Sequence, residues 1–264
     1  MATPNSSLRF RGVVTQFRPL LAWIASLGIC IGVIGGPLED AEAQLKLARG
    51  AWERPGATTE QGWKFAKACF DRAEFCSAKA ERASLAEMGI GAAQEVLRRE
   101  TNNGPAHFYL AMNLGQLART RTLTALGLVS DMEKHFLRAI AIQPGFDHAS
   151  PERSLGMLYR DAPGWPASVG NRTKARKYLE RAVDLDLAFP ENLLTLVESE
   201  IIWEEYKKAQ SRLFGLDLRL KVAEVELTGP AWASTWLDWK QRAEVARKHL
   251  GQSRSETRPV GKAH

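Results

Sequence analysis

Hydrophobic and polar positions recur with a helical period along almost the whole chain after residue 40. Apolar residues lie three or four positions apart, and no stretch shows the strict alternation that is typical of a half-buried β-strand. Breaks containing proline or glycine separate these stretches, as expected between helices. The pattern predicts an all-α protein with helices at residues 41–52, 59–77, 79–99, 105–119, 122–142, 151–160, 171–186, 191–203, 205–225 and 230–249.

The predicted helices form pairs with a recurring arrangement of small and large residues. One pair has small residues where its helices would cross closely and large residues beside them, which is the tetratricopeptide repeat (TPR) pattern. Its positions are Leu155, Gly156, Tyr159, Ala175, Leu179 and Ala182. A unit that begins at Leu110 precedes this pair and one that begins at Leu196 follows it, both in phase with it. Residues 41–99 match the pattern only weakly. The sequence therefore predicts an α-solenoid of TPR-like helical hairpins, which binds partners on a concave surface or in a channel, with an unrelated helical bundle as the alternative.

Three tryptophans mark the last predicted helix. Trp232, Trp236 and Trp239 are spaced so that they share one helix face. We expect this face to pack onto the last repeat, which makes the helix a C-terminal cap; a partner-binding ridge is the alternative. The polar residues 251–264 are predicted to form a disordered tail.

The beginning of the chain has the features of a targeting segment. Three arginines precede an apolar run at residues 20–36, and Ala41 and Ala43 then provide the small residues of a cleavage site. This order predicts a signal peptide over residues 1–43 with cleavage after Ala43, and an uncleaved membrane anchor is the alternative. Cys30 is a poor lipid-attachment site because a bulky residue precedes it. The mature chain is then a helical domain at residues 44–250 that is periplasmic or otherwise exported.

Composition and charge exclude some partners. The chain has 264 residues, 45% of them hydrophobic, and a formal net charge of +6. Basic and acidic residues are interleaved along the helices, so we expect no nucleic-acid partner. Cys69 and Cys76 lie in one predicted helix about 10 Å apart, which is beyond the reach of a disulfide.

The chain lacks the common motifs of catalysis and metal binding. No zinc-protease, nucleophile-elbow, phosphate-loop or dinucleotide-binding motif occurs, and the histidines have no metal-ligand spacing. We therefore expect no enzyme activity, no cofactor and no metal site. Glu198, Glu200, Glu204 and Glu205 form an acidic cluster, for which a solvated face is favoured over acid–base chemistry because no nucleophile is paired with it.

The main candidate for a binding site is the long connection inside the second unit. A plain repeat has a short turn there, whereas this chain has eleven positions from Arg160 to Gly170 that include two prolines. Trp165 lies between the prolines, and it either closes over a ligand or packs onto the next helix. The candidate binding residues here are Tyr159, Arg160, Pro163, Gly164, Trp165 and Pro166.

A second group of polar residues lies on the predicted helix 105–119. Asn113 and Gln116 are three positions apart and share a face, and Arg119 follows them. Such side chains in an apolar helix either line a channel or make polar contacts between repeats, and the contacts are the favoured interpretation.

Several segments together resemble a known family, the T component associated with bacterial TRAP transporters. The segments are residues 107–118, 154–159, 162–170 and 190–192. The resemblance implies an exported, TPR-like periplasmic protein without catalysis. It also implies a solute-binding protein as partner, a pore for a small hydrophobic ligand, and Asn192 as a further candidate binding residue.

The expected function is thus an exported scaffold that binds a protein partner, as an accessory to the solute-binding protein of a TRAP-type transporter. The alternative is a general cell-envelope interaction scaffold with no role in solute transport. Membrane contact is expected only through the N-terminal segment, if that segment is not cleaved.

Overall fold

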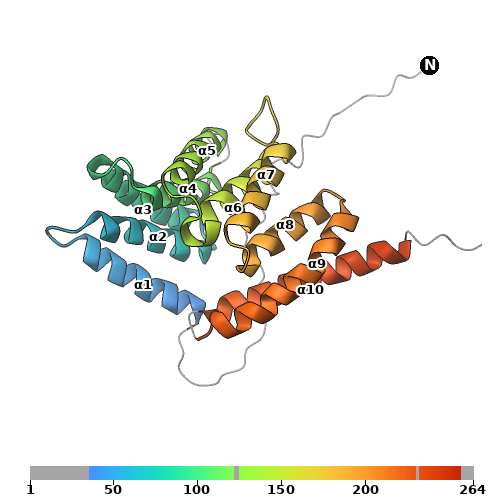
Figure 1. The fold of residues 1–264 in the computed structure, drawn as a ribbon. Helices are drawn as coiled ribbons and strands as arrows, with labels where there is room; N and C mark the ends of the chain where they lie inside the picture. Colours follow the sequence, from blue (N-terminus) through green and yellow to red (C-terminus); the bar gives the residue numbers. More distant parts are fainter. Residues whose placement is uncertain (1–35, 122–124, 230–231, 257–264) are drawn as a thin grey trace, which may run out of the picture.

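The computed structural model describes residues 36–121, 125–229 and 232–256, and within these ranges the chain is helical with no β-strand (Figure 1). The all-α prediction is therefore confirmed. The helices are α1 (Pro37–Trp52), α2 (Thr59–Glu74), α3 (Lys79–Arg99), α4 (Gly104–Ala118), α5 (Ala125–Ile142), α6 (Phe146–Asp161), α7 (Arg172–Leu185), α8 (Pro190–Ile202), α9 (Tyr206–Glu226) and α10 (Ala233–Glu256).

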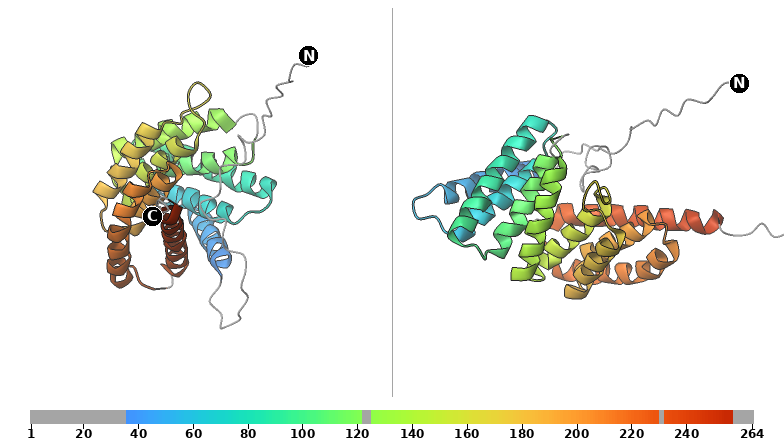
Figure 2. Two further views of the ribbon diagram at one scale, coloured as in Figure 1. Left: turned by 90° about the vertical axis from the view of Figure 1, so that its right-hand side faces the viewer. Right: turned by 90° about the horizontal axis from the view of Figure 1, so that it is seen from above.

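Consecutive helices pack in pairs, and the pairs stack. The pairs are α2 with α3, α4 with α5, α6 with α7, and α8 with α9. The first helices of successive pairs also contact one another, from α2 through α4 and α6 to α8. Figure 2 shows the resulting curved stack from two further directions. This arrangement confirms the predicted α-solenoid of helical hairpins.

Small residues allow the paired helices to approach closely. Gly156 of α6 lies against Leu179 of α7, and a Cβ atom at Gly156 would come within 2.7 Å of the Leu179 Cγ atom. Leu179 is fully buried. Gly89 of α3 is similarly placed against the side chain of Asn113 in α4. The small positions of the repeat pattern therefore serve the helix crossings, as the sequence predicts.

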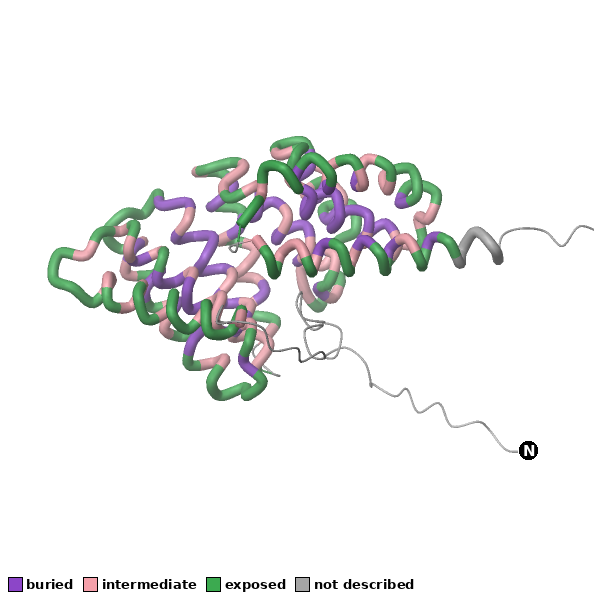
Figure 3. The backbone as a smooth tube through the Cα atoms, turned by 90° about the horizontal axis from the view of Figure 1, so that it is seen from below, coloured by how far each residue is buried: buried purple, intermediate pink, exposed green. Residues whose placement is uncertain are grey.

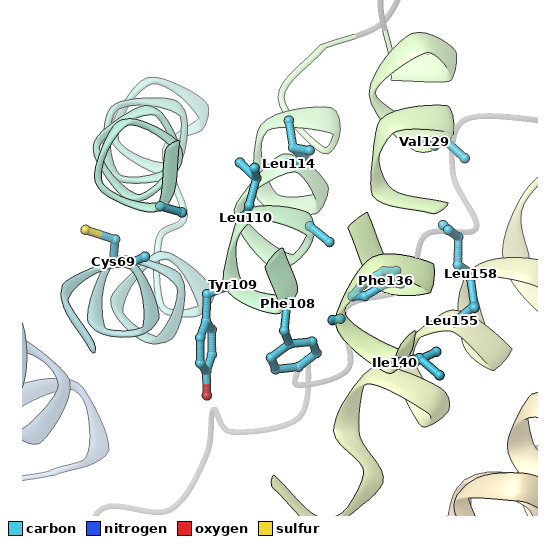
Figure 4. Close-up of a cluster of buried hydrophobic side chains, with 14 of the residues drawn as sticks. Cys69, Phe108, Tyr109, Leu110, Leu114, Val129, Phe136, Ile140, Leu155 and Leu158 are labelled. Atoms are coloured by element: carbon cyan, nitrogen blue, oxygen red, sulfur yellow. The ribbon is translucent and has the colours of Figure 1, made fainter. Parts of the chain in front are cut away.

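The core runs the length of the stack in two large clusters of buried side chains, with a small third cluster at Ala73, Cys76 and Leu85. One cluster joins α2 to α7, and Figure 4 shows its aromatic centre, where the ring centroids of Phe108 and Phe136 are 6.0 Å apart. The other joins α7 to α10. Figure 3 shows that buried positions are concentrated in the middle of the stack. Helix α4 has no exposed residue along its length. The outer helices keep one face in water.

The last helix caps the stack, as predicted. Helix α10 packs on α8 and α9. Trp239 is 1% exposed, and its indole N–H donates to Glu191 Oε2 at 2.6 Å. The indole N–H of Trp236 donates to the Leu227 carbonyl at 2.7 Å. Helix α10 continues to Glu256, past the predicted start of the tail, because one glycine in a helix costs only about 1 kcal/mol.

The N-terminal predictions fall mostly outside the described residues. The predicted leader lies there up to residue 35, and α1 begins at Pro37 rather than at residue 41. The predicted cleavage after Ala43 falls inside α1. Among the described helices, none is long and apolar enough to cross a membrane.

Two helix ends differ from the prediction for local reasons. Helix α2 ends at Glu74, so Cys76 lies beyond it; Cys69 and Cys76 are both free and buried. Helix α6 opens with a left-handed turn, in which Asp147 and His148 have φ angles of 48° and 57°. Regular helix follows this turn, with Pro151 in its first turn, where the missing N–H of proline would have no partner within the helix. The regular part therefore begins close to residue 151, the predicted start.

Candidate functional site

The connection between α6 and α7 is a loop closed at its base. The backbone N–H of Gly170 donates to the Pro163 carbonyl, and that of Asn171 donates to the Tyr159 carbonyl, both at 2.8 Å. Gly170 permits this closure, because a Cβ atom there would lie 2.7 Å from the Pro163 carbonyl oxygen and still closer to that of Ala162. The loop therefore leaves the helical stack from a fixed base.

Trp165 projects from this loop into solvent. Its side chain is 88% exposed, and its neighbours Gly164 and Pro166 are exposed as well. Figure 1 shows the loop standing clear of the helices just before α7. The alternative in which Trp165 packs onto the next helix is therefore wrong. A large indole held in water at the end of an anchored loop is a surface available to a partner.

The other candidate residues of this segment anchor the loop. Tyr159 is buried, and its hydroxyl donates to Glu133 Oε1 at 2.6 Å. Burial and the Glu133 carboxylate raise the pKa of Tyr159. The Arg160 guanidinium donates to Ser199 Oγ (2.9 Å) and to Asp161 (2.6 Å). These side chains join α6 to α5 and α8. The exposed residues of the loop are those at its tip.

The polar residues of α4 bond to α2. Asn113 is fully buried and donates to the Ala66 carbonyl at 2.9 Å. Gln116 is 2% exposed, and it and Arg119 both donate to Glu74 Oε1. Asn113 and Gln116 expose almost no surface to water, so they do not line an open channel. Their geometry is that of polar contacts between repeats.

Asn192 joins three helices beneath the surface. It is 1% exposed, and its amide donates to the carbonyls of Ala182 (3.0 Å) and Asp186 (3.1 Å). Its side-chain oxygen accepts a hydrogen bond from Arg153 at 2.6 Å. Burial lowers the pKa of Arg153, which bonds to neutral oxygens here. The candidate residues thus take part in different contacts between helices, and the structure does not bring them into one site.

Three members of the acidic cluster at the end of α8, which are Glu198, Glu200 and Glu205, are paired with basic residues. Glu200 is fully buried, so a solvated face is wrong for this residue, and Arg212 Nε lies 2.9 Å from its carboxylate. Burial raises the pKa of Glu200 despite this contact. Hydrogen bonds from Lys208, and from two arginines that include Arg176, lower the pKa of Glu205 to about 2. The cluster ties α7, α8 and α9 together.

Two polar features were not found from the sequence. His107 and His135 face each other across α4 and α5 with 2.9 Å between their Nδ1 atoms. Between α10 and α8, Arg242 of α10 contacts Glu191 (3.0 Å) and Glu198 (2.8 Å) of α8. The partners are 28 and at least 44 positions apart, so only the predicted pairing of helices could have indicated them.

A cleft of about 450 Å³ lies at the other end of the stack, between α1, α2 and α3. Its lining includes the apolar side chains of Leu45, Leu85 and Met88. Arg72 also lines it and is already paired with Glu81 at 2.8 Å. None of the candidate residues from the sequence lines this cleft. Over the described parts of the chain, no three His, Cys, Asp or Glu side chains group in a way that could hold a metal ion.

Comparison with known families gives a match in the N-terminal half of the helical stack. Residues 38–157 match the model of the family described as Regulator of microtubule dynamics protein 1-3 (RMD1-3). The match covers less than half of the chain and ends before the α6–α7 loop. No curated protein matches the chain. The matched family differs from the TRAP T component, and that resemblance stays a prediction.

Proposed function

We propose that this chain is a helical scaffold that binds a protein partner through the α6–α7 loop, residues 162–171. The observation that carries the proposal is the 88% exposure of Trp165 on a loop with a hydrogen-bonded base. Tryptophan is enriched among the residues that dominate binding energy at protein interfaces. A fixed base also lowers the entropy lost when the loop is ordered against a partner.

The rest of the molecule supports a scaffold over an enzyme. The buried carboxylates described above are paired with arginines or hydrogen-bonded to neighbouring helices, and they hold the stack together. Stacked helical hairpins commonly present partner-binding surfaces. A rigid stack that positions one projecting tryptophan is consistent with recognition of another protein.

Two classes of partner follow from the similarities. The resemblance to the TRAP T component favours an exported solute-binding protein, and with it export of this chain. The name of the matched RMD1-3 family refers to microtubule dynamics, which favours a cytoskeletal protein instead. The loop geometry serves either partner, so the experiment must identify the protein that is bound.

The test is a crosslinked pull-down of the tagged full-length chain from its own cells, read by mass spectrometry. We expect a stoichiometric protein partner that is lost with Trp165→Ala. Removal of an interface tryptophan of this kind costs on the order of 2 kcal/mol or more, about a thirtyfold loss of affinity. Helicity and melting temperature should not change, because the side chain has few contacts to lose.

The matched control is Leu47→Ala, which removes an apolar side chain that is 67% exposed on α1. This variant should retain the partner. Retention of the partner by Trp165→Ala would show that the loop is not the contact, and the absence of any stoichiometric partner would refute the scaffold proposal. A lower melting temperature for Trp165→Ala would show that Trp165 stabilises the fold instead.

A further inference from the structure

Helix α9 exposes a stripe of apolar side chains on its outer face. Phe214 and Val225 are each 80% exposed, Leu218 is 57% exposed and Val222 is 44% exposed. Their spacing of four, four and three positions aligns them along one side of the helix. The buried residues of α9 lie on the opposite side; they are Ala209, Leu216, Leu220 and Ala223. A helix that faces only water ordinarily presents polar side chains there.

Several charged side chains of α9 are directed to neighbouring helices instead. Asp217 contacts Arg247 of α10 at 2.5 Å, and Glu224 contacts Lys240 of α10 at 2.8 Å. On the other flank, Arg212 bonds to Glu200 of α8, as described above. These pairs leave the outer face to the apolar stripe. Figure 2 shows α9 at the edge of the C-terminal half, where another molecule can reach this face.

The stripe is complementary to itself. When two copies of α9 run in opposite directions about a point between Leu218 and Val222, Phe214 of one copy lies opposite Val225 of the other. Leu218 then lies opposite Val222, so a larger side chain meets a smaller one at every level. We propose that α9 pairs in an antiparallel manner with α9 of a second copy of this chain.

The charges near the stripe favour the same arrangement. Lys221 flanks the stripe and makes no ion pair with any residue that the structure describes. In the antiparallel pair, Lys221 of each copy lies on the same flank as Asp217 of the other and within about one helical turn of it along the axis. A two-fold pair therefore brings opposite charges together in each copy, and this attraction offsets the repulsion between the two Lys221 side chains, which lie about 4 Å apart along the helix axis.

The size of the stripe sets the strength of the pairing. From Phe214 to Val225 it spans about 17 Å at 1.5 Å per residue. A contact of this length buries less than the roughly 1,600 Å² of a standard interface, so the dimer is reversible and depends on protein concentration.

The first experiment is analytical ultracentrifugation of the full-length chain from low micromolar to several hundred micromolar concentration. We expect a monomer–dimer equilibrium that Leu218→Glu weakens at least tenfold, because it places two carboxylates at the centre of the pair. The variant should fold normally, since Leu218 is on the surface. Val245→Glu is the matched control, because Val245 is 62% exposed on α10 outside the stripe, and it should dimerise like the parent.

A second experiment tests the direction of the helices. In the antiparallel pair the two copies of residue 221 are about 4 Å apart along the helix axis, and the two copies of residue 214 are about 17 Å apart. A short thiol crosslinker should therefore join Lys221→Cys chains but not Phe214→Cys chains, with the parent chain as the control for the native cysteines.

The outcomes divide clearly. Crosslinking at both positions would indicate parallel helices and overturn the proposal. A chain that stays monomeric at all concentrations would also overturn it, and would leave another protein or residues 1–35 as the cover of the stripe. A dimer that survives Leu218→Glu would place the interface elsewhere. None of these results bears on the Trp165 loop, so the two proposals fail or stand separately.

Discussion

At the scale of single residues, Gly170 controls the shape of the α6–α7 loop. We expect Gly170→Ala to destabilise the fold by about 1–3 kcal/mol, the usual range when a side chain is forced into a filled space. The added Cβ atom would meet the carbonyl oxygens of Ala162 and Pro163, which belong to the backbone and cannot turn aside. Chemical denaturation of the parent and the variant measures the difference in free energy of unfolding.

Gly91 provides the control for this substitution. It lies inside α3 and is exposed, and a Cβ atom added there would have no neighbouring atom within 4 Å. Gly91→Ala should raise stability by about 0.5–1 kcal/mol, because alanine loses less backbone entropy than glycine in a helix. Equal effects of the two substitutions would show that the loop base tolerates a side chain at residue 170.

The positions of other residues in the structure show what spacing along the chain can and cannot predict. The three-residue interval between Asn113 and Gln116 correctly placed them on one side of a helix. Whether that side is covered depends on α2, which supplies the Ala66 carbonyl and Glu74 from more than 40 positions away. The exposure of Trp165 likewise depends on how the loop base closes, which the order of prolines and glycines does not determine.

At the scale of secondary-structure elements, the histidine pair makes the contact between α4 and α5 sensitive to pH. Burial lowers the pKa of both His107 and His135, and for His135 the neighbouring His107 adds to the effect. The unfolded chain then binds more protons than the folded chain below about pH 6.5. The contribution of the neutral histidine pair to the free energy of unfolding is therefore fully present above that pH and declines as the pH falls. Chemical denaturation at pH 7.5 and pH 5.5 would show the difference.

The double substitution His107→Gln with His135→Gln should reduce this dependence on pH. The charged groups around the pair oppose one another, since Asp131 favours the protonated form of His135 while Lys134 disfavours it, and Arg138 disfavours protonation of His107. In the variant, Asp131, Lys134 and Arg138 can no longer change the pKa of these histidines and act only on other groups. An unchanged loss of stability on acidification would assign the effect to the carboxylates.

The elements themselves were predictable because each has a local signal. The hydrophobic period defines the helices, and proline or glycine marks most of the breaks between them. Thr58 and Asn103, whose side chains accept hydrogen bonds from backbone N–H groups, cap the starts of α2 and α4. The left-handed turn before Pro151 had no such signal, since neither Asp147 nor His148 is a residue that requires a positive φ angle.

At the scale of the whole molecule, stacking gives each helical pair contacts mainly with its neighbours, so a local defect should stay local. Arg242 tests this at the capping helix. Burial would raise the pKa of Glu191, but Arg242 and Arg153, with hydrogen bonds from Arg242 and Trp239, lower it below its usual value. Glu191 is therefore charged while buried, and it depends on Arg242 for neutralisation.

Arg242→Leu should leave that carboxylate without its main partner and cost about 3–5 kcal/mol, as for other broken buried pairs. We expect hydrogen exchange to accelerate in α8 and α10 while α2 to α5 keep their protection, because the contacts of α10 are made with α8 and α9. Arg247→Leu is the control: its pair with Asp217 is partly exposed, so it should cost less than about 1 kcal/mol. Equal acceleration along the whole stack would mean that the solenoid unfolds as a single unit and that the cap stabilises all of it.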